Sequence, residues 1–220
     1  MAFLVDETFE GTGYEESWTE TVGAGATVDE DDDSANAGNP PGWGSQCLKI
    51  IKPAAAEHAY TTRTWTPGAL QFFRLEFVIA SHGLAADDEL AIISAGLSAV
   101  GVNFLVVIER LSGANYLTMY LDTNDDGNID LIAWRDVLQT GVRYRFELKW
   151  DTTNDLWEFW AQGTWKAAGT LTAAAGAILQ LLLGDTADRT IGYTCRHDRI
   201  AVDDATRPES NINPVMFRGS

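Results

Sequence analysis

The sequence has few of the residues that mark common catalytic and metal sites. Two cysteines, Cys47 and Cys195, occur in 220 residues, and without CxxC spacing they do not predict a cysteine zinc site. Each lies in a predicted strand, and the pattern leaves open whether they form a disulfide or are two buried free thiols. Three histidines, His58, His82 and His197, leave few candidates for a general base.

Long hydrophobic runs and an excess of positive charge are also lacking. No apolar segment approaches the roughly 18 residues that a membrane span needs, so insertion into a membrane is not expected. The first residues have neither a basic nor an apolar signal region, so no secretory signal is predicted. Lys and Arg total 15 against 32 Asp and Glu, a net charge of -17, which argues against nucleic acid and anionic membranes as partners. This charge suits a solvated surface, cation binding or a neutral partner such as a glycan.

Apolar residues make up 45% of the chain, with 8 Trp, which is enough for a substantial core. The clearest element is residues 144–163, YRFELKWDTTNDLWEFWAQG, which predicts two strands joined by a polar turn. In the first strand the apolar residues are Tyr144, Phe146, Leu148 and Trp150, and the charged residues between them are Arg145, Glu147 and Lys149. Because side chains alternate between the faces of a strand, one face is predicted to be buried and the other wet. The segment 72–81 repeats this pattern, with Phe77 on the buried face.

About a dozen such short strands follow one another, with turn signals every 8 to 12 residues and neither a repeat nor a convincing amphipathic helix. Residues 14–45 and 170–177 are predicted loops, because Pro, Gly, acidic or small residues dominate them. This pattern predicts an all-β antiparallel sandwich over residues 1–205, followed by a C-terminal extension at 206–220.

The order of strand sequences also carries a resemblance to a known superfamily. The segments FEG, GSQCLKI, FFRLEFVIA, YRFELKWD and RIAVDDA follow one another between residues 3 and 205. In this order they resemble the concanavalin A-like lectin/glucanase superfamily, the laminin-G-like jelly rolls. The resemblance implies two curved sheets, with ligands on the concave sheet or its rim loops. Members include lectins, carbohydrate-binding modules, glycoside hydrolases, polysaccharide lyases and adhesion or virion proteins, so the fold alone does not decide the function.

Catalytic motifs of that superfamily are missing. Its glucanases carry E-x-D-x-x-E on one strand, which places the acid and the nucleophile on one face, and no such run occurs here. The carboxylates that could pair across strands are Glu76, Glu109, Glu147 and Glu158, and their expected neighbours are Arg74, Arg145 and Lys149. This arrangement predicts ion pairs on a wet face rather than an acid–base pair. His197, beside Asp198, is interpreted as structural, and no histidine lies in a lyase motif.

Residues 122–130, DTNDDGNID, match the first nine positions of an EF-hand-type calcium loop. The predicted ligands are the side chains of Asp122, Asn124 and Asp126, the carbonyl of Asn128, and Asp130 directly or through water. The match ends at the twelfth position, where Ala133 replaces the bidentate Glu, and the flanking segments predict strands. The alternative is a polar hairpin turn, since Asp, Asn and Gly are also the residues of tight turns.

The resemblance implies a second cation site. Related carbohydrate-binding jelly rolls hold a structural calcium with a Glu in the opening F-E-x-G and an Asp in the closing strand. The matching positions are Glu10 and Asp198, and the match in the closing strand is loose.

Aromatic residues on predicted wet faces are candidates for glycan contact, because a sugar ring stacks on an aromatic platform beside planar polar groups. These candidates are Tyr116, Tyr120 and Trp160, with Glu76, Arg145 and Glu158 able to lie nearby, and Trp43 in the Pro/Gly loop. The alternative for each is ordinary surface or packing between subunits. We therefore expect neutral oligosaccharides to bind weakly and without turnover, and Trp160→Ala to lose this binding while the protein stays folded.

These observations favour a non-enzymatic sandwich that binds glycans or serves as an adhesive part of a larger particle, on a virion or an extracellular surface. A compact acidic chain of this kind resembles phage virion proteins with the same fold. The alternatives are a glycoside hydrolase or polysaccharide lyase, and a purely structural oligomer such as a capsid decoration protein. Expected partners are a glycan or polysaccharide, further copies of the chain or virion proteins, and calcium.

Overall fold

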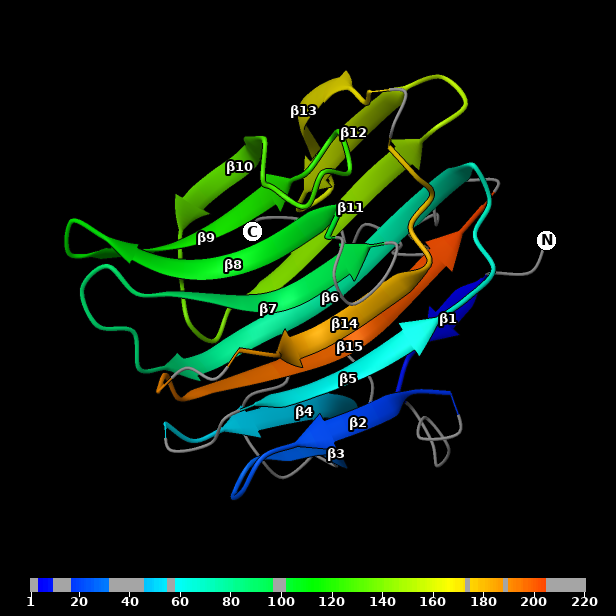
Figure 1. Cartoon of the computed structure of the whole chain (residues 1–220). Coiled ribbons are helices and arrows are strands. Elements are labelled where there is room, and N and C mark those ends of the chain that lie inside the picture. Colours follow the sequence, from blue (N-terminus) through cyan, green and yellow to red (C-terminus); the bar gives the residue numbers. More distant parts are fainter. Residues whose placement is uncertain are drawn as a thin grey trace, which may run out of the picture.

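The structure is a computed structural model, and it describes residues 4–9, 17–31, 46–54, 58–96, 102–172, 175–187 and 190–204. Every regular element in these ranges is a β-strand, and the strands form two antiparallel sheets that pack face to face (Figure 1). The predicted all-β antiparallel sandwich is therefore confirmed. No helix of the described ranges is long and apolar enough to span a membrane. The predicted extension at 206–220 lies outside the described residues.

Sheet A has eight strands in the order β13-β12-β11-β6-β15-β4-β3, with β1 paired to β15. Its strands are β1 (Val5–Glu7), β3 (Thr27–Asp31), β4 (Cys47–Lys52), β6 (Leu70–His82), β11 (Arg143–Asp151), β12 (Leu156–Ala161), β13 (Thr164–Thr170) and β15 (Tyr193–Asp203). The opening and closing strands of the described chain thus lie side by side.

Sheet B has seven strands in the order β10-β9-β8-β7-β14-β5-β2 and lies in front of sheet A in Figure 1. Its strands are β2 (Thr19–Val22), β5 (Ala59–Thr64), β7 (Glu89–Gly96), β8 (Phe104–Leu111), β9 (Ala114–Leu121), β10 (Leu131–Val137) and β14 (Gln180–Asp185). In both sheets a late strand takes a central place: β14 lies between β7 and β5, and β15 lies between β6 and β4.

The hairpin predicted at residues 144–163 is present as β11 and β12, with Leu148 opposite Phe159. Its turn is held by the Asp151 carboxylate, which accepts hydrogen bonds from the backbone N–H groups of Thr153 and Asn154. The side chains predicted to be buried, Phe77, Phe146, Leu148 and Trp150, all lie in the core. Alternation therefore assigned the inner face of this hairpin correctly.

Three strands were not predicted from the sequence. β2 and β3 lie within the predicted loop 14–45, and β13 precedes the predicted loop 170–177. Each is the last strand at an edge of its sheet. An edge strand needs less apolar sequence than a central one, and β13 is mostly exposed. The alternation of apolar and polar residues is consequently weak in these three strands.

Aromatic rings join the two sheets at the centre of the core. Phe146 of β11 meets Phe77, Phe159 and, from sheet B, Trp134, with ring centroids 5.2 Å apart in each pair and the rings edge to face. This geometry is the one that aromatic quadrupoles favour. Full burial of one such ring stabilises the fold by about 1.5–3 kcal/mol.

Both cysteines are free and buried, so of the two alternatives left by the sequence the structure has the free thiols. Cys195 lies in the core with its Sγ 3.4 Å from Nε2 of His197. Burial raises the pKa of the Cys195 thiol and lowers the pKa of His197 to about 3. His197 is therefore a neutral core histidine at physiological pH, in agreement with its structural interpretation.

Candidate functional site

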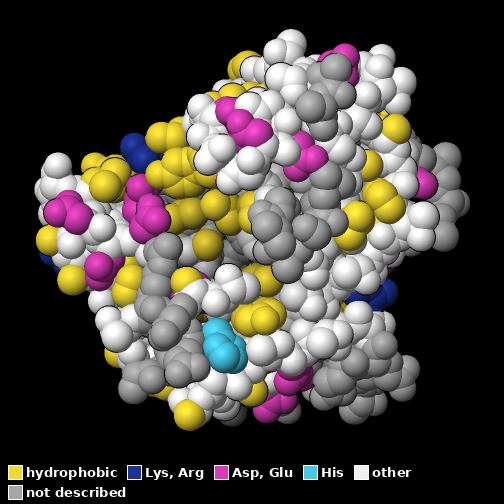
Figure 2. Space-filling view, viewed as in Figure 1, with side chains coloured by type: hydrophobic (Ala, Val, Ile, Leu, Met, Phe, Trp, Pro, Cys, Tyr) yellow, Lys and Arg dark blue, Asp and Glu magenta, His cyan; other side chains and the backbone are white. Residues whose placement is uncertain are grey.

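The outer face of sheet B carries two of the aromatic candidates. In β9, Leu117, Met119 and Leu121 are buried in the core. The side chains between them point away from the core, which places Tyr116 and Tyr120 on the outer face. Figure 2 views this side of the molecule and shows hydrophobic side chains gathered over β8, β9 and β10.

A hydrogen-bond network on this face fixes the hydroxyl of Tyr120. That hydroxyl donates to Oε2 of Glu109 at 3.0 Å and accepts from Nη2 of Arg135 at 3.1 Å. Oε1 of Glu109 accepts from Nε of Arg135 at 2.9 Å and from the hydroxyl of Thr118. The Arg135 guanidinium also lies 6.0 Å from the ring centroid of Tyr116, within reach of a cation–π contact. Three neighbouring strands, β8, β9 and β10, thus hold one rigid polar cluster.

The electrostatics of the cluster keep Tyr120 protonated. Burial is the largest influence, and together with the hydrogen bond and charge of Glu109 it raises the pKa of Tyr120, against an opposing effect of Arg135. Glu109 is almost fully buried, and both of its oxygens accept hydrogen bonds from protein groups. Tyr120 can therefore offer a ring face and a neutral hydroxyl, whereas Glu109 acts as its anchor.

Beside this cluster lies a cavity of about 250 Å³, called here the Tyr120 cavity. It is lined by Glu89, Ala91, Leu105, Val107, Tyr120 and Ile129. Its walls are mostly apolar, with one aromatic ring and one carboxylate. A mainly apolar pocket with a few converging polar groups is the usual form of a small-molecule site.

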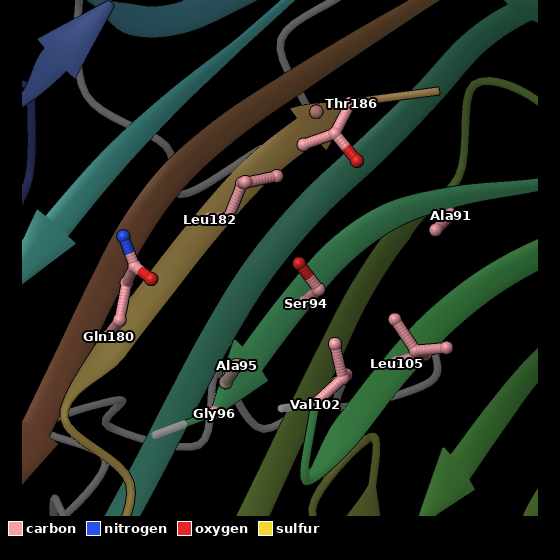
Figure 3. A pocket seen from close by; sticks show the side chains of 10 residues that line it. Ala91, Ser94, Ala95, Gly96, Val102, Leu105, Gln180, Leu182 and Thr186 are labelled. Atoms are coloured by element: carbon pink, nitrogen blue, oxygen red, sulfur yellow. The ribbon is translucent and has the colours of Figure 1, made fainter. Parts of the chain in front are cut away.

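A second cavity of about 110 Å³, the Gln180 cavity, lies over the middle of the same sheet. It is lined by Ala91, Ser94, Ala95, Gly96, Val102, Leu105, Gln180, Leu182, Gly184 and Thr186. Figure 3 shows Gln180 and Leu182 on β14 across from Ser94 on β7 and Leu105 on β8. Ala91 and Leu105 line both cavities.

Two carboxylates face each other across β7 and β8 on this side of the sheet. Glu89 is paired with Glu109 in the antiparallel register, and Glu89 lines the Tyr120 cavity. Like charges opposite each other destabilise a sheet, and the ion pair of Glu109 with Arg135 at 2.9 Å offsets this repulsion. The pair differs from a glycosidase dyad, because Glu109 is engaged by three protein donors.

The other predicted ligand-binding residues lie on sheet A. Trp160 and Glu158 are on β12, Arg145 is on β11 and Glu76 is on β6, all on the face that points away from the core. The structure thus brings these four to one face of sheet A. It does not bring Trp160 together with Tyr116 and Tyr120, which lie on the opposite side of the sandwich. The expectation of a single aromatic platform is therefore corrected. Alternation shows which side chains share one face of a strand, but it does not show to which sheet that strand belongs.

The predicted ion pairs of sheet A are present. Glu76 pairs with Arg74 and Arg143, Glu147 pairs with Arg145, and Lys149 lies 3.2 Å from Glu158. The prediction that this face is wet was wrong for Arg74, Glu76 and Glu147, which are at most 2% exposed. Each of these charges is enclosed by partners of opposite sign on its own or the next strand, and such pairing allows a charge to be buried.

The predicted calcium loop forms a self-supporting turn. The buried Asp122 carboxylate accepts hydrogen bonds from the N–H groups of Asn124, Asp125 and Gly127 at 2.8–3.2 Å. Oδ2 of Asp130 accepts from the backbone N–H and the hydroxyl of Thr123 at 2.7 and 2.9 Å. These contacts match the hairpin-turn alternative.

The loop side chains do not converge as a cation site does. Asp126 and Asn128 are exposed and bond to each other, and the N–H of Asn128 lowers the pKa of Asp126. Within the described ranges, no three His, Cys, Asp or Glu side chains are gathered in a way that could hold a metal ion. Calcium ligation would therefore require the loop oxygens to move together, and calcium binding stays a prediction.

Two further predicted residues, Glu10 and Trp43, lie outside the described residues. Asp198, the other half of the second predicted cation site, is buried on β15. The opening strand does pair with β15, with Asp6 opposite Ala201. The second cation site therefore also stays a prediction.

Sequence reasoning did not find the roles of Glu109, Thr118 and Arg135. A signal for the first two was present in the turn between β8 and β9. Ser112 and Gly113 form a two-residue turn with positive φ angles of 51° and 87°, and Ser-Gly is a turn dipeptide. Such a turn pairs Glu109 with Tyr116. The Glu109 carboxylate then lies within reach of Thr118, the next residue on the same face of β9.

No protein-family model matches the sequence, and no curated protein sequence matches it. Solved structures with a similar fold include the cellulose induced protein Cip1, with a TM-score of 0.65 and 18% identity over 92% of this chain and 98% of that one. A carbohydrate esterase from the Shiga toxin-encoding bacteriophage phi24B has a TM-score of 0.64 and 15% identity, covering 91% and 97% of the two chains. The alginate lyase AlgAT5, of polysaccharide lyase family 7, has a TM-score of 0.58 and 9% identity, covering 84% and 93%. At these identities the likeness concerns the fold, and it is consistent with the concanavalin A-like jelly roll expected from the sequence.

Proposed function

We propose that this protein binds carbohydrate without turnover, at the Tyr120 cavity on the outer face of sheet B. The observation that carries the proposal is the fixed position of Tyr120, whose ring lines the cavity while Glu109 and Arg135 hold its hydroxyl. A stacked sugar needs a flat aromatic surface beside polar groups, and this arrangement supplies both. A ring that is already held in place loses little freedom on binding, which favours affinity.

Binding is favoured over hydrolysis or elimination by the state of the polar groups. A general base must be deprotonated at working pH, and the pKa of Tyr120 is raised, mainly by burial. Glycoside hydrolysis needs two carboxylates facing the substrate, whereas the oxygens of Glu109 are engaged by Thr118, Tyr120 and Arg135. These contacts suit a rigid recognition surface.

The structural neighbours support a carbohydrate ligand through their fold class. A carbohydrate esterase and an alginate lyase share this fold, and the binding domain of botulinum neurotoxin DC in complex with SialylT does so at 6% identity. They differ in whether they catalyse a reaction. The choice of binding therefore rests on the Tyr120 cluster and not on the neighbours.

The proposal is tested by a glycan array followed by calorimetric titration of the full chain. Tyr120→Ala should abolish binding, and Tyr120→Phe, which keeps the ring but loses both hydrogen bonds of the hydroxyl, should weaken it. Trp160→Ala is the matched control, because Trp160 lies on the other sheet and its loss should leave binding unchanged. Absence of binding to every glycan by the folded wild-type protein would contradict the proposal.

A structural role in an assembly is the second candidate, and exposed apolar side chains favour it. Val137 of β10 is 54% exposed and Trp165 of β13 is 56% exposed, and both strands are the last in their sheets. Exposed apolar residues on edge strands are common at subunit contacts. As a decoration or adhesion protein of a virion, the chain should sediment as an oligomer, and Trp165→Ser should shift it toward the monomer.

A further inference from the structure

The two cavities of sheet B lie next to each other, and together they are called the groove here. Ala91 and Leu105 line both, so the Tyr120 cavity and the Gln180 cavity share a wall. The groove begins at Tyr120 on β9, crosses β8 and β7, and ends at Gln180 on β14. Neighbouring strands lie about 4.8 Å apart, so these three spacings give a groove roughly 14 Å long. That length exceeds what one sugar ring needs.

The lining of the groove is nearly uncharged. Among the described residues that line it, Glu89 is the one charged side chain, in a protein of net charge -17. An anionic chain would meet that net charge without a lysine or arginine in the lining to offset it. A cationic ligand would meet a single carboxylate along the whole groove. The groove therefore suits a neutral ligand.

Its two ends differ in chemistry. The Tyr120 end offers an aromatic ring with apolar walls from Val107 and Ile129. The far end offers side-chain donors and acceptors from Ser94, Gln180 and Thr186. Between them the shared wall consists of the apolar side chains of Ala91 and Leu105.

We propose that the groove binds several consecutive units of an unbranched neutral polysaccharide, with one subsite at Tyr120 and another at Gln180. This inference rests on the proposed function and extends it to the length and charge of the ligand. One unit stacks at Tyr120, and the hydroxyls of a later unit bond to Ser94 and Gln180. Binding energy gained at the second subsite adds to that of the first, because the linkage removes the cost of a second association.

The test is calorimetric titration with neutral oligosaccharides of increasing length. The probes are cello-, xylo- and manno-oligosaccharides from the disaccharide to the hexasaccharide, with alginate oligosaccharides as the anionic comparison. The wild-type protein should bind the tetrasaccharide of the preferred series about tenfold more tightly than the disaccharide. Ser94→Trp, which fills the second cavity, and the milder Gln180→Ala should each remove this gain and leave the disaccharide affinity unchanged. Lys166→Ala, an exposed change on β13 of sheet A, is the control.

The outcomes separate the two proposals. Equal affinity for all lengths, together with no effect of Gln180→Ala, would overturn the extended groove and leave glycan binding at Tyr120 intact. Tighter binding of alginate oligosaccharides than of any neutral series would overturn the neutral ligand. No binding at any length would overturn both. A length-dependent gain that Gln180→Ala removes supports the second subsite even if Ser94→Trp fails to fold.

Discussion

The side-chain amide of Gln71 forms two hydrogen bonds with the backbone of Ile178. Its Nε2 donates to the Ile178 carbonyl at 2.6 Å, and its Oε1 accepts from the Ile178 N–H at 2.7 Å. Gln71 is on β6 of sheet A, and Ile178 precedes β14 of sheet B. Both residues are fully buried, so one polar side chain connects sheet A, inside the core, to the segment that leads into β14.

Replacing Gln71 should destabilise the fold. Gln71→Ala leaves the N–H and carbonyl of Ile178 buried without these partners, a loss that typically costs about 1–3 kcal/mol. Urea unfolding measures this change in the free energy of unfolding. Gln139→Ala, an exposed side chain before β11, should change it little. If the two variants are equally stable, the amide link does not stabilise the core.

Removing an aromatic ring at the centre of the core should have a larger effect. Phe146→Ala should lower the free energy of unfolding by about 3–5 kcal/mol, since it leaves a cavity among three other rings. Lys149→Ala on the same strand removes two partly exposed ion pairs, with Glu158 and Asp151, and should cost about 1 kcal/mol, less than the loss of Phe146. A greater loss for Lys149→Ala than for Phe146→Ala would contradict the assigned faces of β11.

Stability should fall in mild acid because of His197. Burial lowers its pKa in the native protein to about 3, whereas an unfolded histidine titrates near about 6.5. Between these two pKa values the unfolded state binds more protons than the native state, so the free energy of unfolding rises with pH. The contribution of His197 to stability is fully present above about pH 6.5 and is lost progressively below it. His197→Gln removes this contribution. Unfolding measured between about pH 8 and pH 5 should show wild type losing more stability than the variant; parallel losses would refute the prediction.

Calcium should raise the melting temperature if residues 122–130 bind it. An ion that binds only the native state stabilises it by mass action. Asp126→Ala should remove most of the gain, whereas Asp136→Ala, an exposed carboxylate on β10, should keep it. A melting temperature that does not respond to calcium would leave the hydrogen-bonded turn around Asp122 as the whole role of this loop.

The strands and their inner faces could be predicted from the sequence, because alternation is a local property of the chain. Phe146 and Trp150 were assigned to the core on that basis, and both are buried. The site could be predicted only in part. Tyr120 and Trp160 have the same local pattern, and nothing local shows that β9 and β12 belong to different sheets.

The burial of Glu76 could not be predicted for a related reason. Its neighbours in space include Arg143, which lies 67 residues away in sequence and pairs with it across β6 and β11. The cluster around Tyr120 also depends on a distant residue, since Arg135 comes from β10. Contacts of this kind follow from strand order and register, which short sequence patterns do not determine.

The central places of β14 and β15 have a consequence for how the chain folds. Without these two strands, β7 and β5 have no common neighbour in sheet B, and β6 and β4 have none in sheet A. During synthesis, the earlier strands can form hairpins, but sheet B cannot close before β14 ends at Asp185, and sheet A cannot close before β15 ends at Asp203. Folding is therefore expected to be slow and to occur after most of the chain has been made, because its decisive contacts are non-local. Until then the open edges of β5, β7, β4 and β6 are exposed to pairing with other chains, which favours aggregation of the nascent protein.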